Sequence, residues 1–134
     1  MIKTKEDITK YKVFFRRVNT TGNIQYQEFA DAIYRENYLP SEILILNEDG
    51  VSANTNIEKR PQMKRLIQMI INDLVEIVYV YDRSRLFRDF YAFNYFVLLC
   101  RQHNVNIFDI SSRNGNQKPT LFEQLIKIQS EVEE

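Results

Sequence analysis

The chain alternates short runs that favour β-strands with segments of helical length. Branched and aromatic residues predict strands at 12–18 (KVFFRRV), 42–47 (EILILN) and 75–81 (VEIVYVY), with a weaker run at 105–110 (VNIFDI). The helical segments between them are 24–37, 61–73 and 88–104. Because each crossover between parallel strands carries a helix over the sheet, this order predicts an α/β domain with a mostly parallel sheet covered on both faces.

The last part of the chain predicts a separate helix. After a polar loop at 111–119 (SSRNGNQKP), the segment 120–134 (TLFEQLIKIQSEVEE) places one apolar residue every three or four positions, on one face of a helix. These residues are Leu121, Leu125, Ile128 and Val132. We therefore expect one domain over 1–119 and the beginning of a longer helix over 120–134. Its unfinished apolar stripe indicates either that the polypeptide continues or that a partner subunit covers it.

Composition narrows the possible functions. With 134 residues and 44% apolar residues, the chain suits one globular domain. Eighteen basic side chains balance eighteen acidic ones, so a site for a polyanion has to be a local cluster. A single cysteine, Cys100, and a single histidine, His103, exclude an internal disulfide and a zinc cluster, so we expect no metal and no other cofactor.

The location of the protein is predicted from what the sequence lacks. The first twelve residues, MIKTKEDITKYK, have scattered charges and no apolar core of a signal peptide, and no apolar run approaches the roughly 20 residues of a membrane span. We expect a cytoplasmic protein with no membrane partner.

Arginines gather where the predicted strands end. In parallel sheets ligands bind beyond the carboxyl ends of the strands, and five arginines follow three of these ends: Arg17, Arg60, Arg83, Arg85 and Arg88. Guanidinium groups pair bidentately with phosphate and stay charged at any working pH. The cluster therefore indicates a phosphate site. The alternative is that the arginines pair with acidic residues in a surface network, namely with Asp49, Glu58, Asp82 and Asp89.

Three motifs near these arginines resemble those of the serine recombinases, the resolvase and invertase family. FFRRVNT resembles the Y-x-R-V-S-T start of that family, EDGVSANTNIEKRP its D-x-G-x-S-G loop followed by R-P, and VYDRSRLFRD its V-Y-x-x-D-R-L-x-R segment. The terminal SEVEE is similar to the A-E-x-E-R stretch of the family's long helix. The resemblance, from about residue 12 to 134, implies a three-layer resolvase-like domain: a mostly parallel sheet of four to five strands flanked by helices, with the start of a long dimerisation helix.

The resemblance also implies a reaction and a set of site residues. In the family a serine of the first motif attacks DNA, forms a phosphoserine link to the 5′ end and releases a 3′ hydroxyl, while arginines bind the scissile phosphate. The matching arginines are Arg17, Arg60, Arg85 and Arg88. Gln27 is the best match to the family's glutamine. DNA is the implied partner, with a homodimer or higher oligomer formed through the C-terminal helix.

Two positions depart from the family pattern. Asn19 occupies the place of the serine, and Ser84 occupies the place of the aspartate before Arg85. An asparagine amide has no ionisable hydroxyl and cannot form the covalent link. The hydroxyl groups that could substitute belong to Thr20, Thr21, Ser52 and Ser84.

Three interpretations follow from these departures. The first is a recombinase catalytic domain that is inactive as given. The second is a non-catalytic DNA-binding or regulatory module that pairs with an active relative. The third is a scaffold with purely structural arginines and no polyanion partner.

Residues outside the motifs have ordinary structural interpretations. We expect His103 to be a partly exposed capping residue and Cys100 to belong to the core. The apolar segment FYAFNYFVLL is mainly core, with Tyr91 or Tyr95 as possible contacts to a second subunit.

Overall fold

The computed structural model describes residues 9–18, 24–52 and 56–112. The strands and helices are β1 (Tyr11–Val18), α1 (Ile24–Arg35), β2 (Ile43–Asp49), α2 (Pro61–Ile71), β3 (Val75–Val80), α3 (Phe90–Gln102) and β4 (Asn106–Asp109). Three short 3-10 helices lie between them: η2 (Pro40–Glu42), η3 (Ile57–Lys59) and η4 (Arg83–Arg85). The predicted strand-helix alternation is confirmed; the C-terminal helix expected at 120–134 lies outside the described residues.

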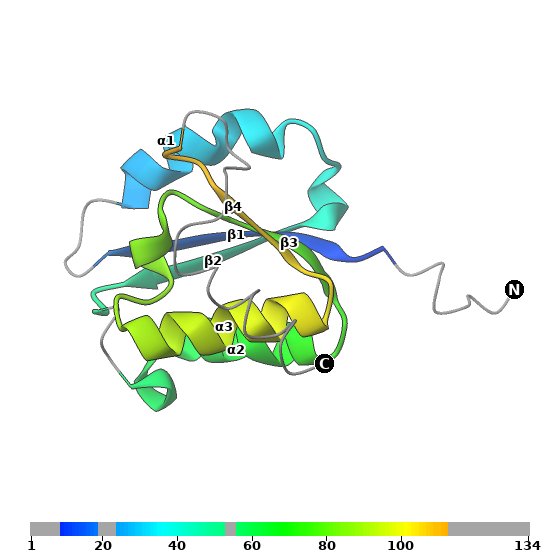
Figure 1. The fold of residues 1–134 in the computed structure, drawn as a ribbon. Coiled ribbons are helices and arrows are strands. Elements are labelled where there is room, and N and C mark those ends of the chain that lie inside the picture. Colours follow the sequence, from blue (N-terminus) through cyan, green and yellow to red (C-terminus); the bar gives the residue numbers. More distant parts are fainter. Residues whose placement is uncertain (1–8, 19–23, 53–55, 113–134) are drawn as a thin grey trace, which may run out of the picture.

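The described strands form one parallel sheet. Their order across the sheet is β2-β1-β3-β4, and every neighbouring pair runs parallel. Helix α1 covers one face, and α2 and α3 cover the other (Figure 1). The prediction of a parallel sheet with helices on both faces is therefore confirmed.

The main core lies between the sheet and the pair α2 and α3. Helix α2 buries Met63, Leu66 and Ile70, which recur with helical spacing, and α3 buries Phe93, Phe96, Val97 and Cys100. Burial raises the pKa of the Cys100 thiol to about 12, so the group stays protonated at neutral pH. The expectation that Cys100 belongs to the core is confirmed.

The C-terminal end of α3 is closed by a histidine, as predicted. His103 is the C-cap residue of α3, and its side chain is 23% exposed. Its Nδ1 atom lies 2.8 Å from Oδ1 of Asp73, which follows α2. On the same helix the side chains of Tyr91 and Tyr95 are exposed, at 69% and 70%.

Helix α1 packs in an unusual way, with polar side chains toward the sheet. Its buried residues are Gln27 and Asp31, whereas Phe29 and Ile33 are 83% and 67% exposed. A helix normally buries its apolar stripe. The position of α1 is therefore set by polar contacts to β1, which are described below, together with the ring of Tyr34 against Tyr79 and Phe108.

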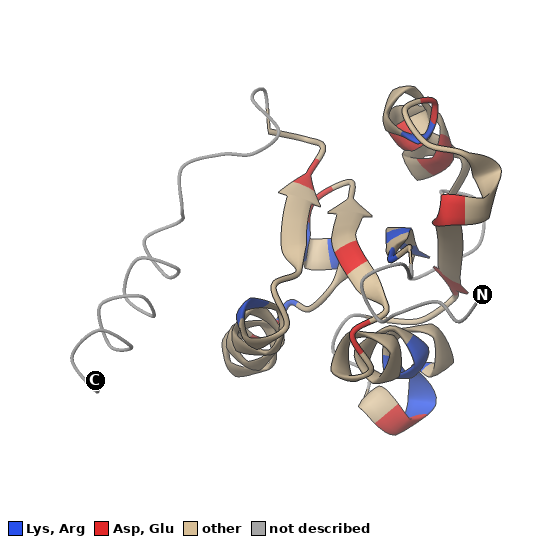
Figure 2. Cartoon of the chain, turned by 90° about the vertical axis from the view of Figure 1, so that its right-hand side faces the viewer, with Lys and Arg blue, Asp and Glu red and all other residues tan. Residues whose placement is uncertain are grey.

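Charged groups are spread over both helical layers. Basic and acidic residues occur together on α1 and around η3 and α2 (Figure 2). Over the described ranges, no helix combines the length and apolar character that a membrane span requires. Within the same ranges, no three His, Cys, Asp or Glu side chains are grouped as metal ligands.

Candidate functional site

The two consecutive arginines of β1 point to opposite faces of the sheet. Arg16 contacts α1 through Asp31, while Arg17 contacts the segment after β3 through Ser84 and Arg85. Side chains alternate along a strand, so this separation follows from the strand geometry. Arg17 therefore lies on the α2 and α3 side of the sheet, near its carboxyl edge.

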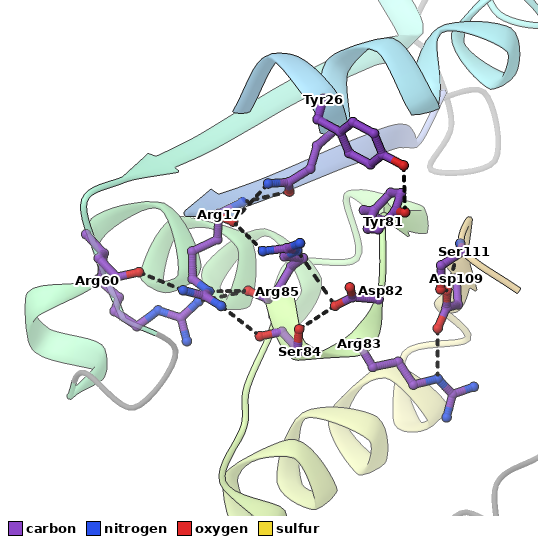
Figure 3. Close-up of polar contacts among 12 residues, drawn as sticks. Arg17, Tyr26, Arg60, Tyr81, Asp82, Arg83, Ser84, Arg85, Asp109 and Ser111 are labelled. Atoms are coloured by element: carbon purple, nitrogen blue, oxygen red, sulfur yellow. Dashed lines mark hydrogen bonds and ion pairs between the residues drawn. The ribbon is translucent and has the colours of Figure 1, made fainter. Parts of the chain in front are cut away.

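Arg17 is fully buried and holds two loops together (Figure 3). Its Nε donates to the carbonyl of Arg85 at 3.0 Å, and Nη2 donates to the carbonyl of Ser84, also at 3.0 Å. Nη1 donates to the carbonyl of Val51 at 2.9 Å, in the loop after β2. The guanidinium group thus joins the segments that follow β2 and β3 at one point.

Arg60, just before α2, is also fully buried and pairs with a carboxylate that is itself buried. Its Nε and Nη2 lie 2.9 and 2.8 Å from Oε1 of Glu48, and both side chains are 0% exposed. Nη1 donates to the carbonyl of Leu86 at 2.6 Å. The other oxygen of Glu48 accepts from the backbone N–H of Met63 at 3.0 Å, so the pair also anchors the first turn of α2.

The two remaining arginines of the predicted set are closer to solvent. Arg85 has a 26% exposed side chain, with Nε 3.7 Å from Oδ1 of Asp82 and the guanidinium carbon 5.7 Å from the centre of the Tyr81 ring. Arg88 is exposed. Ser84 is half-buried and its hydroxyl donates to the carboxylate of Asp82. A bound anion would meet Arg85 and Arg88 before it met Arg17 or Arg60.

Gln27 fixes the end of β1 from the α1 side. Its Oε1 accepts from the backbone N–H of Arg17 at 3.1 Å, and its Nε2 donates to the carbonyl of Arg17 at 3.0 Å. The side chain is 2% exposed, so both of these buried polar atoms are paired. Gln27 therefore helps to hold the residue whose side chain joins the loops.

Several positive charges lie close together in the cluster and affect one another. The pKa of Arg17 is lowered to about 10, first by burial and then by the positive charges of Arg60, Arg85 and Arg88. Glu48 acts in the opposite direction. At neutral pH the guanidinium group remains charged, so several cations share one region with the carboxylates of Glu48 and Asp82. A negatively charged group would relieve their mutual repulsion.

Several of the predicted site residues lie close together. The structure brings Arg17, Arg60 and Arg85 together, since the carbonyl of Arg85 accepts from Nε of Arg17 and lies 3.5 Å from Nη2 of Arg60. Ser52 is half-buried in the loop after β2, next to Val51. Asn19, Thr20 and Thr21 lie outside the described residues.

The alternative network of acidic partners is present only in part. Arg85 approaches Asp82 as that alternative expected, but Arg60 pairs with Glu48 rather than with Asp49 or Glu58. Glu58 binds Lys64 at 2.9 Å, and Asp89 caps α3 by accepting from the N–H of Ala92. The internal partners of the arginines are therefore mostly backbone carbonyls, which carry no compensating charge.

Sequence reasoning missed Glu48, although the strand pattern contained a signal for it. Leu44, Leu46 and Glu48 alternate along β2 and so share one face of the sheet, and Leu46 and Glu48 are both buried. A carboxylate that continues an apolar strand face requires a cation. The register places Glu48 directly beside Arg17.

Comparisons with known proteins identify the family. The family model described as "Resolvase, N terminal domain" matches residues 13–134. No sequence among the curated proteins matches this chain significantly.

Solved structures match over most of the chain. The N-terminal catalytic domain of TP901-1 integrase is 25% identical, with a TM-score of 0.62, over 92% of this chain and 99% of that domain. A serine recombinase from Sulfolobus solfataricus is 25% identical, with a TM-score of 0.55, over 90% and 79%. The first ORF of transposon ISC1904 from Sulfolobus solfataricus P2 shares the fold at 22% identity, with a TM-score of 0.61 over 90% and 79%. The chain therefore belongs to the resolvase family and carries the N-terminal, catalytic-type domain of a site-specific recombinase.

Proposed function

We propose that this domain binds a phosphate of the DNA backbone at the arginine cluster and does not form a covalent link to it through residue 19. The observation that carries the proposal is the convergence of Arg17 and Arg60 on the carbonyl of Arg85. The two buried arginines hold η4 in place, and Arg85 and Arg88 lie toward solvent, where they contact the phosphate. Because phosphate contacts carry no base information, binding by this domain is independent of sequence.

The similarity to recombinase structures supports DNA as the partner. TP901-1 integrase and the Sulfolobus solfataricus serine recombinase share this fold at 25% identity. In the family reaction a serine oxygen bonds to phosphorus and displaces the 3′ oxygen. With Asn19 in that place the nucleophile is absent, while the groups that bind the phosphate are retained.

The replacement of the family's serine and aspartate favours a second candidate function. A domain with Asn19 and Ser84 at these positions suits a regulatory partner that pairs with an active recombinase and binds DNA without cutting it. Pairing would use the helix predicted at 120–134. Mixing with an active relative and measuring its cleavage rate distinguishes this role from that of an isolated binding domain.

The proposed phosphate contacts predict a change in the salt dependence of binding. Replacing Arg85 or Arg88 by alanine should make the negative slope of log K against log salt concentration shallower by about 1 each, because binding then releases about one fewer counterion. Fluorescence anisotropy with a labelled duplex at several salt concentrations measures the slope. Arg101→Ala is the matched control, because Arg101 is exposed at the opposite end of α3 and should leave the slope unchanged. Equal slopes in all variants would contradict the proposed contacts.

The missing nucleophile is tested by trapping covalent products. We expect the unchanged chain to leave supercoiled DNA without a protein–DNA adduct, detected by denaturing electrophoresis, and Asn19→Ser to restore the hydroxyl required for one. Adding Ser84→Asp also brings back the family's aspartate and should increase the yield of the protein–DNA adduct. An adduct on the unchanged chain, mapped to Thr20, Thr21, Ser52 or Ser84, would show that another hydroxyl has replaced the serine.

A further inference from the structure

A pocket adjoins the arginine cluster between η4 and the start of α3. It has a volume of about 340 Å³, within the range of small-ligand sites, and is lined by Arg83, Ser84, Phe87, Arg88, Phe90 and Phe93. Phe87 and Phe93 are only 7% and 9% exposed, whereas Phe90 is 54% exposed. The pocket thus combines two nearly buried aromatic rings with a third that is accessible from solvent.

The pocket shares residues with the arginine cluster. The guanidinium carbon of Arg60 lies 4.9 Å from the centre of the Phe87 ring. The carbonyl of Ser84 accepts from Arg17. A chain of nucleotides with one phosphate at the cluster would therefore have a neighbouring nucleoside within reach of the pocket.

The chemistry of the lining suits a planar group attached to an anion. The Arg83 guanidinium carbon lies 6.0 Å from the centre of the Phe93 ring, and its Nε lies 3.8 Å from Oδ2 of Asp109. Arg88 adds a second, exposed cation. An inorganic anion would leave the phenylalanine rings unused, and an aliphatic side chain would leave the cations unused. A nucleobase stacks on aromatic rings while its phosphates attract arginines.

We propose that this pocket binds one unpaired nucleobase of the DNA strand whose phosphate lies at the arginine cluster. The inference rests on the proposed function and adds a base subsite to it. Moving a base out of a duplex breaks its stacking and pairing, which is unfavourable. The domain therefore prefers single-stranded DNA, or duplex with an unpaired base, over perfect duplex.

The test compares two single strands that differ only in their bases. A labelled thymidine oligonucleotide and an abasic oligonucleotide of equal length have the same backbone charge, so both engage the arginines. The unchanged chain should bind the thymidine strand about 5- to 150-fold more tightly, the equivalent of about 1–3 kcal/mol for one stacked base. Phe90→Ala should remove this preference without changing the affinity for the abasic strand, and Phe90→Tyr should keep it.

Tyr95→Ala is the matched control for the phenylalanine variant. Tyr95 is a 70% exposed aromatic residue of the same helix that does not line the pocket, so its removal should leave the preference intact. Equal affinity of the unchanged chain for both strands would overturn the base subsite and leave the phosphate site standing. An equal loss in Phe90→Ala and Tyr95→Ala would also overturn it. Absence of binding to either strand would overturn the proposed function itself.

Discussion

Replacing Arg60 by methionine should lower the free energy of unfolding by about 3–5 kcal/mol. The substitution leaves the carboxylate of Glu48 buried without its cation, and the loss of one partner from a buried ion pair costs about this much. Both side chains are 0% exposed, with Nη2 of Arg60 2.8 Å from Oε1 of Glu48, so water cannot replace the missing charge without a rearrangement. Urea unfolding followed by circular dichroism measures the difference.

An exposed ion pair beside the same helix supplies the control. Lys64 and Glu58 lie 2.9 Å apart, but their side chains are 46% and 73% exposed. Exposed pairs of this kind contribute about 0–1 kcal/mol, so Lys64→Met should change stability by no more than that. If Arg60→Met proved as mild as Lys64→Met, the buried pair would not have the structural role that its geometry indicates.

The ion pair between Arg60 and Glu48 also affects how the DNA affinity of an Arg60 variant is interpreted. The family resemblance places this residue at the phosphate, but its contacts in the structure are with Glu48 and the carbonyl of Leu86. A weaker DNA affinity in an Arg60 variant would therefore combine a lost charge with a displaced η4. Arg85 and Arg88 are the better positions for testing phosphate contact, because their side chains are nearer to solvent.

Much of the fold could be predicted because local patterns and packing agree. The strands are rich in branched and aromatic residues, and the stripe of Met63, Leu66 and Ile70 has helical spacing that matches its buried face. Helix α1 could be located but its orientation could not. Phe29 and Ile33 are exposed, whereas Tyr34 of the same helix packs against Tyr79 and Phe108. The expectation that a helix packs its apolar face on the sheet fails for Phe29 and Ile33, because buried polar contacts also decide how α1 packs.

The candidate site could be predicted only as a set of residue types. The positions of Arg17 near the end of one strand, and of Arg60 and Arg85 after two others, indicated a common edge, and the structure brings them together there. Which of these arginines are buried and which reach solvent was not predictable, because that depends on the carbonyls and carboxylates that each guanidinium contacts. Glu48 shows the difference: its partner comes from a separate segment, twelve residues further along the chain.

Replacing Asp31 by alanine should also cost about 3–5 kcal/mol of unfolding free energy, because it leaves the guanidinium of Arg16 buried without its counter-charge. Arg16 and Asp31 are 2% and 3% exposed, and two bonds of 2.8 and 3.0 Å join them. Arg35, which also contacts Asp31 at 2.6 Å, has a 27% exposed side chain and can be hydrated after the change. Chemical unfolding measures the loss, and Glu28→Ala, an exposed substitution on the same helix, should stay within about 0.5 kcal/mol.

A second variant separates the buried charge from the loss of packing. In Arg16→Met/Asp31→Leu both charges are absent, and stability should recover much of the loss, because apolar replacements of a buried pair are often neutral. No recovery would assign the loss to packing instead.

The same helix carries Gln27, which binds the backbone of Arg17 from the α1 side. A looser α1 in Asp31→Ala should therefore also weaken DNA binding, although Asp31 contacts none of the arginines proposed to meet the phosphate. The double variant should restore stability and DNA affinity together.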